Sequence, residues 1–121
     1  MEIVRSTRWR AVQDGRLPGL PEGGMVRVVV GKRPVLFVRH DGSLRAMEDR
    51  CPHQGRALSG GWMDDGHVVC PFHRFHFDPV TGACRHGLTV NVGTYAVREN
   101  EKGVWMGTPY TTLRLFGIDL W

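Results

Sequence analysis

Two short segments of the chain combine cysteine with histidine at metal-ligand spacing. The first is Cys51-Pro-His53, and the second, sixteen residues later, is Cys70-Pro-Phe-His73. Two thiolates and two imidazoles suit a zinc ion or an iron–sulfur cluster. The Cys-x-His spacing favours a cluster, because side chains this close along the chain wrap poorly around one ion but can each reach a different metal atom. The two segments together can deliver two thiolates to one iron and two imidazoles to its neighbour.

The residues around these segments resemble Rieske [2Fe–2S] proteins, in particular ring-hydroxylating oxygenases and their ferredoxins. The resemblance is carried by residues 51–59, with the sequence Cys-Pro-His-Gln-Gly-Arg-Ala-Leu-Ser, and by two later segments, 75–78 (Phe-His-Phe-Asp) and 81–84 (Thr-Gly-Ala-Cys). It extends to the lead-in segments 9–12 and 41–50, and so covers roughly residues 9–106 of the chain. The two cysteine–histidine motifs, called boxes from here on, together offer four ligands and are far more specific than a single short motif.

By this resemblance, Cys51 and Cys70 bind the inner iron of one [2Fe–2S] cluster, and His53 and His73 bind the outer iron. Two ferric ions, two sulfides and two thiolates form a formally neutral unit, whereas four thiolates would leave a double negative charge. An electron is added more easily to the neutral unit, which places Rieske potentials at roughly −150 to +300 mV. High-potential members donate Ser and Tyr hydroxyl groups to the cluster. Phe72, which precedes His73, has no hydroxyl, and we therefore expect a potential at the low end of this range.

Two positions depart from the oxygenase-like pattern. Gln54 stands where arginine is common, and Arg74 stands where glycine is common after the second histidine. Arg74 brings a permanent charge beside the outer iron. Two consequences are open: a different choice of partner, or a different backbone angle in the second loop.

The composition bounds the class of protein. A chain of 121 residues fits one domain, 1–121, and 41% hydrophobic with 23% charged residues is ordinary for a globular protein. No apolar run approaches the length of a membrane span, and the N-terminus lacks the order of a secretory signal. Three cysteines, an odd number, argue against a disulfide framework and for a reducing compartment. We expect a cytoplasmic protein in which Cys84, the cysteine outside the boxes, is a small buried apolar residue.

The net charge of +4 does not come from a run of basic residues in the sequence. Charges alternate in sign along the chain, and aromatic residues are not interleaved with a Lys/Arg run. The surplus is therefore interpreted as a solvated surface and not as a nucleic-acid site. It could also steer docking to an acidic redox partner.

Short alternating segments between glycines and prolines predict an all-β fold with a Rieske-type antiparallel β-sandwich or barrel as its base. Met25–Val30 and Pro34–Arg39 are expected to form a hairpin, and the Asp41-Gly42 turn leads into a strand at Leu44–Glu48. A cluster-binding subdomain at about 49–86 is inserted in this base. Further strands are expected at residues 9–12, 67–70, 74–78, 83–86, 94–98 and 104–106.

The apolar tail, 107–121, is expected to pack back on the domain, with docking on another subunit or the start of a linker as alternatives. The other histidines and the large aromatic residues have ordinary interpretations. His76 is expected on a strand, and solvated positions are expected for His40, His67 and His86. Core or cluster-covering positions are expected for Trp62, Phe75 and Phe77.

The resemblance implies an electron carrier, a ferredoxin that passes single electrons from a flavin reductase to a terminal oxygenase. The alternative is the Rieske domain or small subunit of a multicomponent non-haem iron oxygenase. In that family the second iron, held by two histidines and a carboxylate, needs a further large domain, and we expect this chain not to oxygenate a substrate alone. A structural zinc module is the remote alternative.

Overall fold

The structure is a computed structural model that describes residues 2–52, 55–72, 74–85, 90–115 and 118–119 of the chain. Within these ranges the regular structure is β-strand with one short 3₁₀ helix, which confirms the predicted all-β class. The elements are β1 (Glu2–Ala11), β2 (Met25–Val30), β3 (Arg33–His40), β4 (Ser43–Glu48), η1 (Leu58–Gly60), β5 (Trp62–Asp64), β6 (His67–Val69), β7 (His76–Phe77), β8 (Thr94–Asn100), β9 (Gly103–Leu115) and β10 (Ile118–Asp119).

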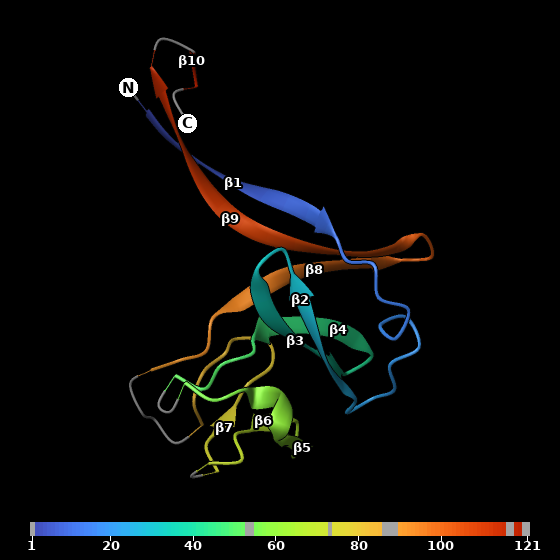
Figure 1. Ribbon diagram of the computed structural model, residues 1–121. Helices are drawn as coiled ribbons and strands as arrows, with labels where there is room; N and C mark the ends of the chain where they lie inside the picture. The colour runs from blue at the N-terminus through green and yellow to red at the C-terminus, as the bar shows by residue number, and fades with distance from the viewer. Residues whose placement is uncertain (1, 53–54, 73, 86–89, 116–117, 120–121) are drawn as a thin grey trace.

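The strands form two antiparallel sheets. The larger one has the order β1-β9-β8-β4-β3-β2, with β10 also paired to β9, and the smaller one has the order β5-β6-β7. The small sheet occupies the connection between β4 and β8, which pair directly through Ala46↔Tyr95 and Met47↔Thr94. Figure 1 shows it at the end of the molecule opposite the ribbon of β1 and β9.

The β2-β3-β4 meander follows the sequence prediction closely. β2 and β3 pair from Met25↔Val38 to Val30↔Arg33, and β3 and β4 pair across the Asp41-Gly42 turn. Both turn residues have positive φ angles, +52° and +77°, as a type I′ hairpin turn requires. Short valine-rich strands joined by two-residue turns leave this segment little choice of register.

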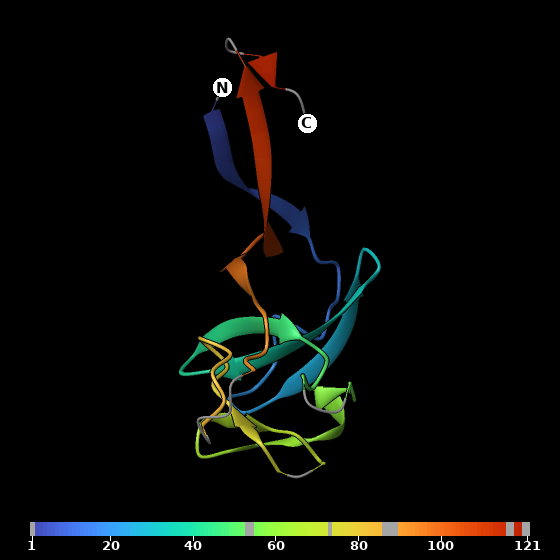
Figure 2. The same ribbon diagram turned by 90° about the vertical axis from the view of Figure 1, so that its left-hand side faces the viewer.

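The first strand and the tail differ from the prediction. β1 has ten residues and pairs with β9 from Glu2↔Arg114 to Ala11↔Trp105. Residues 107–115 therefore continue β9 as one half of a ribbon that projects from the body, and they do not fold back over it (Figures 1 and 2). Residues 4–8, Val-Arg-Ser-Thr-Arg, are too polar to show a buried face, and so the long strand has no periodic signal in the sequence.

The smaller sheet was only partly predicted. β6 is at its predicted place, whereas the strand expected at 74–78 is reduced to β7 and the one expected at 83–86 to an isolated bridge between Cys84 and Phe77. Residue 86 lies outside the described residues. β5 was not predicted, because three residues are too few to show an alternating pattern in the sequence. In the structure only the methionine between the other two is half-buried.

The strand β3 separates two apolar clusters. Val35 and Phe37 belong to one, Leu36 and Val38 belong to the other, and all four are fully buried. A strand with both faces covered has a continuous apolar run instead of alternation. The cluster on the side of the small sheet contains Leu36, Val38, Met47, Cys51, Leu58, Val68, Cys70, Phe77, Cys84 and Val92. The sheets are thus joined by a core that includes all three cysteines.

Arg39 on β3 is a buried cation that ties three segments together. Its guanidinium forms a bidentate ion pair with Glu99 of β8, at 2.6 and 3.0 Å, and donates to the carbonyl oxygens of Leu17 at 2.9 Å and Leu20 at 3.1 Å. The Glu99 carboxylate raises the pKa of Arg39 and keeps it charged. The long loop between β1 and β2 is held against the sheet by these contacts.

Replacing Arg39 by methionine should lower the free energy of unfolding by about 3 kcal/mol or more, because Glu99 and the loop carbonyls lose their partner. Urea denaturation of the cluster-loaded protein, followed by circular dichroism, measures this change. The matched control is Arg85→Met, which removes an exposed ion pair to Asp65 at 3.5 Å and should cost at most about 1 kcal/mol. Equal costs for the two variants would contradict the role of Arg39.

Candidate metal centre

The two cysteine-containing boxes form loops that are closed in the same way. The backbone N–H of Cys51 donates to the carbonyl of Arg56 at 2.7 Å, and that of Cys70 donates to the carbonyl of Phe75 at 2.9 Å. In each loop the cysteine is thus bonded to the residue five positions later. The predicted ligands His53 and His73 fall within these two loops in the sequence, and both lie outside the described residues.

The thiols of the two boxes lie together in the core. Cys51 and Cys70 are both fully buried free thiols, and they are within hydrogen-bonding reach of each other. Burial raises the pKa of the Cys70 thiol to about 11; a hydrogen bond from the backbone N–H of Phe72 opposes the rise, and the adjacent Cys51 adds to it. A metal bound here would displace protons from both sulfurs and supply the positive charge that buried thiolates need.

This arrangement fits one iron of a two-iron cluster. The donor pair is soft, as iron–sulfur clusters require, and the two sulfurs come from loops that are separate in sequence and adjacent in space. Cys84 is the third buried thiol of the same apolar cluster, and its N–H donates to the side chain of Asn91 at 3.2 Å. The prediction that Cys84 is a buried apolar residue is confirmed.

Asp49, which the sequence pattern did not single out, anchors the first loop. Its carboxylate accepts hydrogen bonds from the backbone N–H and the hydroxyl of Ser59, at 2.7 and 2.6 Å, and pairs with Arg27 of β2 at 2.7 Å. Its side chain is fully buried, and a buried carboxylate needs such partners. The available signal was an acidic residue two positions before the first cysteine, which becomes informative only once Ser59 and Arg27 are known to be neighbours.

Gly61 lets the two boxes approach each other. A Cβ atom at this position would lie 1.8 Å from the carbonyl oxygen of Val69 and 3.2 Å from Cδ of Pro71, the residues that flank Cys70. The second contact is tight, and the first is prohibitive because a backbone carbonyl cannot yield that far, so β5 can pair with β6 in this way only with glycine at residue 61. At Gly60 the nearest such atom is 3.8 Å away, an ordinary contact.

The outer surface of the loops is basic and partly aromatic. Arg74 has a φ of +55°, the left-handed region that costs a non-glycine residue about 1 kcal/mol. Of the two consequences of Arg74 that the sequence left open, the structure therefore shows the different backbone angle in the second loop. Phe72 is 39% exposed, and the guanidinium of Arg56 from the first loop lies 4.2 Å from its ring centroid. This cation–π contact connects the two loops at the surface.

The predicted positions of the other aromatic residues and histidines can now be compared with the structure. Phe77 is in the core and Phe75 packs against it, whereas Trp62 is 45% exposed, which corrects its expected core or covering role. His76 is on β7, as predicted. His67 begins β6 and bonds through Nδ1 to the carbonyl of Asp65. The prediction for His86 lies outside the described residues.

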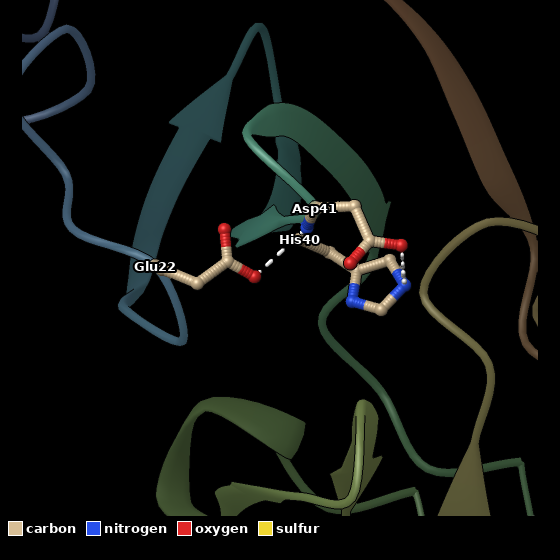
Figure 3. Close-up of side chains that lie close together, drawn as sticks. All are labelled: Glu22, His40 and Asp41. Carbon is tan, nitrogen blue, oxygen red and sulfur yellow. Dashed lines mark hydrogen bonds and ion pairs between the residues drawn. The ribbon is translucent and has the colours of Figure 1, made fainter.

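A second group of potential metal ligands lies near the β3–β4 turn, where Glu22, His40 and Asp41 are close together (Figure 3). The Glu22 carboxylate accepts hydrogen bonds from the backbone N–H groups of Asp41 at 2.8 Å and Gly42 at 2.9 Å, which lower its pKa. Its two oxygens are therefore engaged by the turn. We interpret the group as a structural contact that holds the β1–β2 loop to this turn.

Among the described residues, no helix has the length and apolar character needed to cross a membrane.

Comparison with known proteins identifies the family. The model of the Rieske [2Fe-2S] domain matches residues 10–96, and this chain belongs to the Rieske [2Fe–2S] family. The cofactor is one [2Fe–2S] cluster of the Rieske type, consistent with the two adjacent buried thiols, and the zinc-module alternative is set aside.

The relatives are of two kinds. The chain is 36% identical over 97 residues to the oxygenase component of chloroacetanilide N-alkylformylase from Rhizorhabdus wittichii, an alignment that covers 73% of this chain and 28% of the relative. It is 31% identical over 83 residues to the ferredoxin component of the naphthalene 1,2-dioxygenase/salicylate 5-hydroxylase systems of a Ralstonia species, covering 68% and 80%. The chain thus spans less than a third of the first relative and most of the second.

A solved structure supports the same fold. A chain in the complex of reduced oxygenase and oxidized ferredoxin of carbazole 1,9a-dioxygenase superposes with a TM-score of 0.65 at 32% identity, covering 72% of this chain and 91% of that one.

Replacing Gly61 by alanine should lower the free energy of unfolding by at least about 1–3 kcal/mol and reduce cluster content, because the new methyl group collides with the Val69 carbonyl. The neighbouring substitution Gly60→Ala is the control and should leave both properties close to those of the natural sequence. Urea denaturation and the visible absorbance of the purified proteins measure the two effects. Similar behaviour of the two variants would show that the close approach at Gly61 is unimportant.

Proposed function

We propose that this protein is a Rieske ferredoxin, a carrier of single electrons from a reductase to a terminal oxygenase. The observation that carries the proposal is the pair of adjacent buried thiols, Cys51 and Cys70, beneath two loops closed in the same way. The cluster bound there supplies reversible one-electron redox chemistry at a potential above that of all-cysteine ferredoxins. Alignment over most of both this chain and a ferredoxin component of a dioxygenase system supports the carrier role.

The ligand assignment is part of the proposal. Cys51 and Cys70 hold the inner iron, and His53 and His73 hold the outer iron. The backbone N–H of Phe72 already points to the Cys70 sulfur and would stabilise a thiolate there. His53 follows Cys51 by two residues and His73 follows Cys70 by three, so each box supplies one thiolate and one imidazole from a short stretch of sequence.

The surface around the loops suggests an acidic partner. Arg56 and Arg74 lie on the loops, Arg50 precedes the first cysteine, and all three are exposed. Clustered positive charge accelerates the encounter with an acidic surface, and added salt screens this attraction. We propose that the reductase and the oxygenase dock in turn at this end of the molecule.

We further propose that residues 1–121 act as one Rieske domain with a cluster-binding subdomain at about 49–86. The continuous apolar cluster between β3 and the small sheet supports this organisation. Three buried free thiols suit a reducing compartment, and we place the protein in the cytoplasm.

An oxygenase component is the second candidate, favoured by the 36% identity to the oxygenase component described above. The mass of the full chain in native solution distinguishes the two. A carrier should run as a free monomer near 13.6 kDa plus its cluster at micromolar concentration. A stable larger assembly with a second polypeptide would support the oxygenase component and contradict the free carrier.

The midpoint potential should fall in the lower part of the Rieske range, between roughly −150 mV and 0 mV, because Phe72 offers no hydroxyl to the cluster. A redox titration of the loaded protein gives this value, and a potential well above zero would refute the expectation.

Arg74→Gln should lower the midpoint potential further, since a nearby cation favours electron uptake. Lys102→Gln, which removes an equal charge in the β8–β9 turn, should leave it unchanged.

A further inference from the structure

A cavity of about 580 Å³ lies between the β1–β9 ribbon and the tip of the β2–β3 hairpin. Figures 1 and 2 show the tip of the β2–β3 hairpin on the side of the body from which the ribbon projects, away from the small sheet. The lining residues are Arg8, Arg10, Val30, Gly31, Lys32, Arg33, Met106 and Thr108.

The strand register explains how the ribbon side of the cavity is built. Arg8 is directly opposite Thr108 and Arg10 is directly opposite Met106, so all four side chains share one face of the ribbon. The hairpin tip closes the other side, and Nη1 of Arg10 is 2.8 Å from where a Cβ atom on Gly31 would be. Two elements distant in sequence thus meet across the cavity.

The charge of the lining is of one sign. Four of the eight residues are cationic, and none is acidic. Arg8, Arg10, Lys32 and Arg33 form no ion pair with any carboxylate that the structure describes, unlike Arg16, Arg27, Arg39 and Arg85 elsewhere. The segments that supply them, 3–13 and 24–40, contain no Asp or Glu, and neither does 102–118. Like charges gathered without counter-charges favour an anion between them.

The cavity also has aromatic and apolar contacts. The guanidinium of Arg8 lies 4.7 Å from the ring centroid of Tyr110, which limits its freedom, and Val30 and Met106 are buried beneath the charged groups. Arginine presents paired N–H donors that match a phosphate or carboxylate. The volume lies within the range of roughly 300–1,000 Å³ that small-molecule sites occupy.

We propose that this cavity binds a small organic polyanion through phosphate or carboxylate groups held by Arg8, Arg10 and Lys32. The site goes beyond electron transfer and uses no residue of the cysteine loops. Its failure and the failure of the carrier role are therefore distinguishable.

The test is isothermal titration calorimetry of the cluster-loaded full chain with pyrophosphate and, separately, with citrate. Saturable binding of one ion per chain is expected, and the preferred probe identifies the phosphate or the carboxylate class. Arg10→Gln should weaken binding about tenfold or more, the scale of one charge-assisted hydrogen bond. The control Arg5→Gln removes the same charge on β1 outside the cavity, and it should change affinity less than about twofold.

Two results would overturn the proposal: no saturable binding of either probe, or equal weakening by Arg10→Gln and Arg5→Gln. Arg33 also lines a neighbouring cavity with Glu48 and is therefore not chosen for substitution. Lys32→Gln, at the exposed hairpin tip, is the second test variant should Arg10→Gln fold poorly, and the same weakening is expected.

Discussion

The contact between two buried thiols lies where the two loops, the small sheet and β3 of the base sheet meet. Cys51 and Cys70 belong to different loops, yet their side chains share one apolar cluster with Leu36 and Val38 of β3. The base sheet therefore supports the loops from below, and the loops are closed above by matching backbone hydrogen bonds from the two cysteines. A cluster bound there would lie between a rigid core and the surface, where electron exchange with a partner requires it.

Two features independently hold this contact in place. Gly61 permits the approach of the two boxes, and Asp49 fixes the first loop to Ser59 and Arg27. Each is a polar or backbone constraint at the edge of an apolar core, where geometry is less forgiving than hydrophobic packing. The small sheet has few residues of its own, and these contacts give it a defined position, to which a bound cluster would add stability.

The sequence predicted correctly those features of the structure that depend on residues close together in the chain. The β2-β3-β4 meander was correct because valine-rich strands and an Asp-Gly turn specify it within 24 residues, Met25–Glu48. The cysteine boxes and the buried state of Cys84 were also visible in the sequence. The long β1–β9 ribbon, the partners of Asp49 and the basic cavity were not, because each depends on the pairing of segments far apart in the chain. Alternating charges in the sequence concealed the cavity, since β1 and the β2–β3 turn meet only in the folded protein.

The most direct test of the paired-thiol centre is the iron and acid-labile sulfide content of the purified chain and of three variants, Cys51→Ser, Cys70→Ser and Cys84→Ser. The account predicts two irons and two sulfides per chain in the natural sequence and in Cys84→Ser, with loss of both elements in the other two variants. Bound zinc in place of iron, a cluster retained after substitution of Cys51 or Cys70, or loss caused only by Cys84→Ser would contradict it.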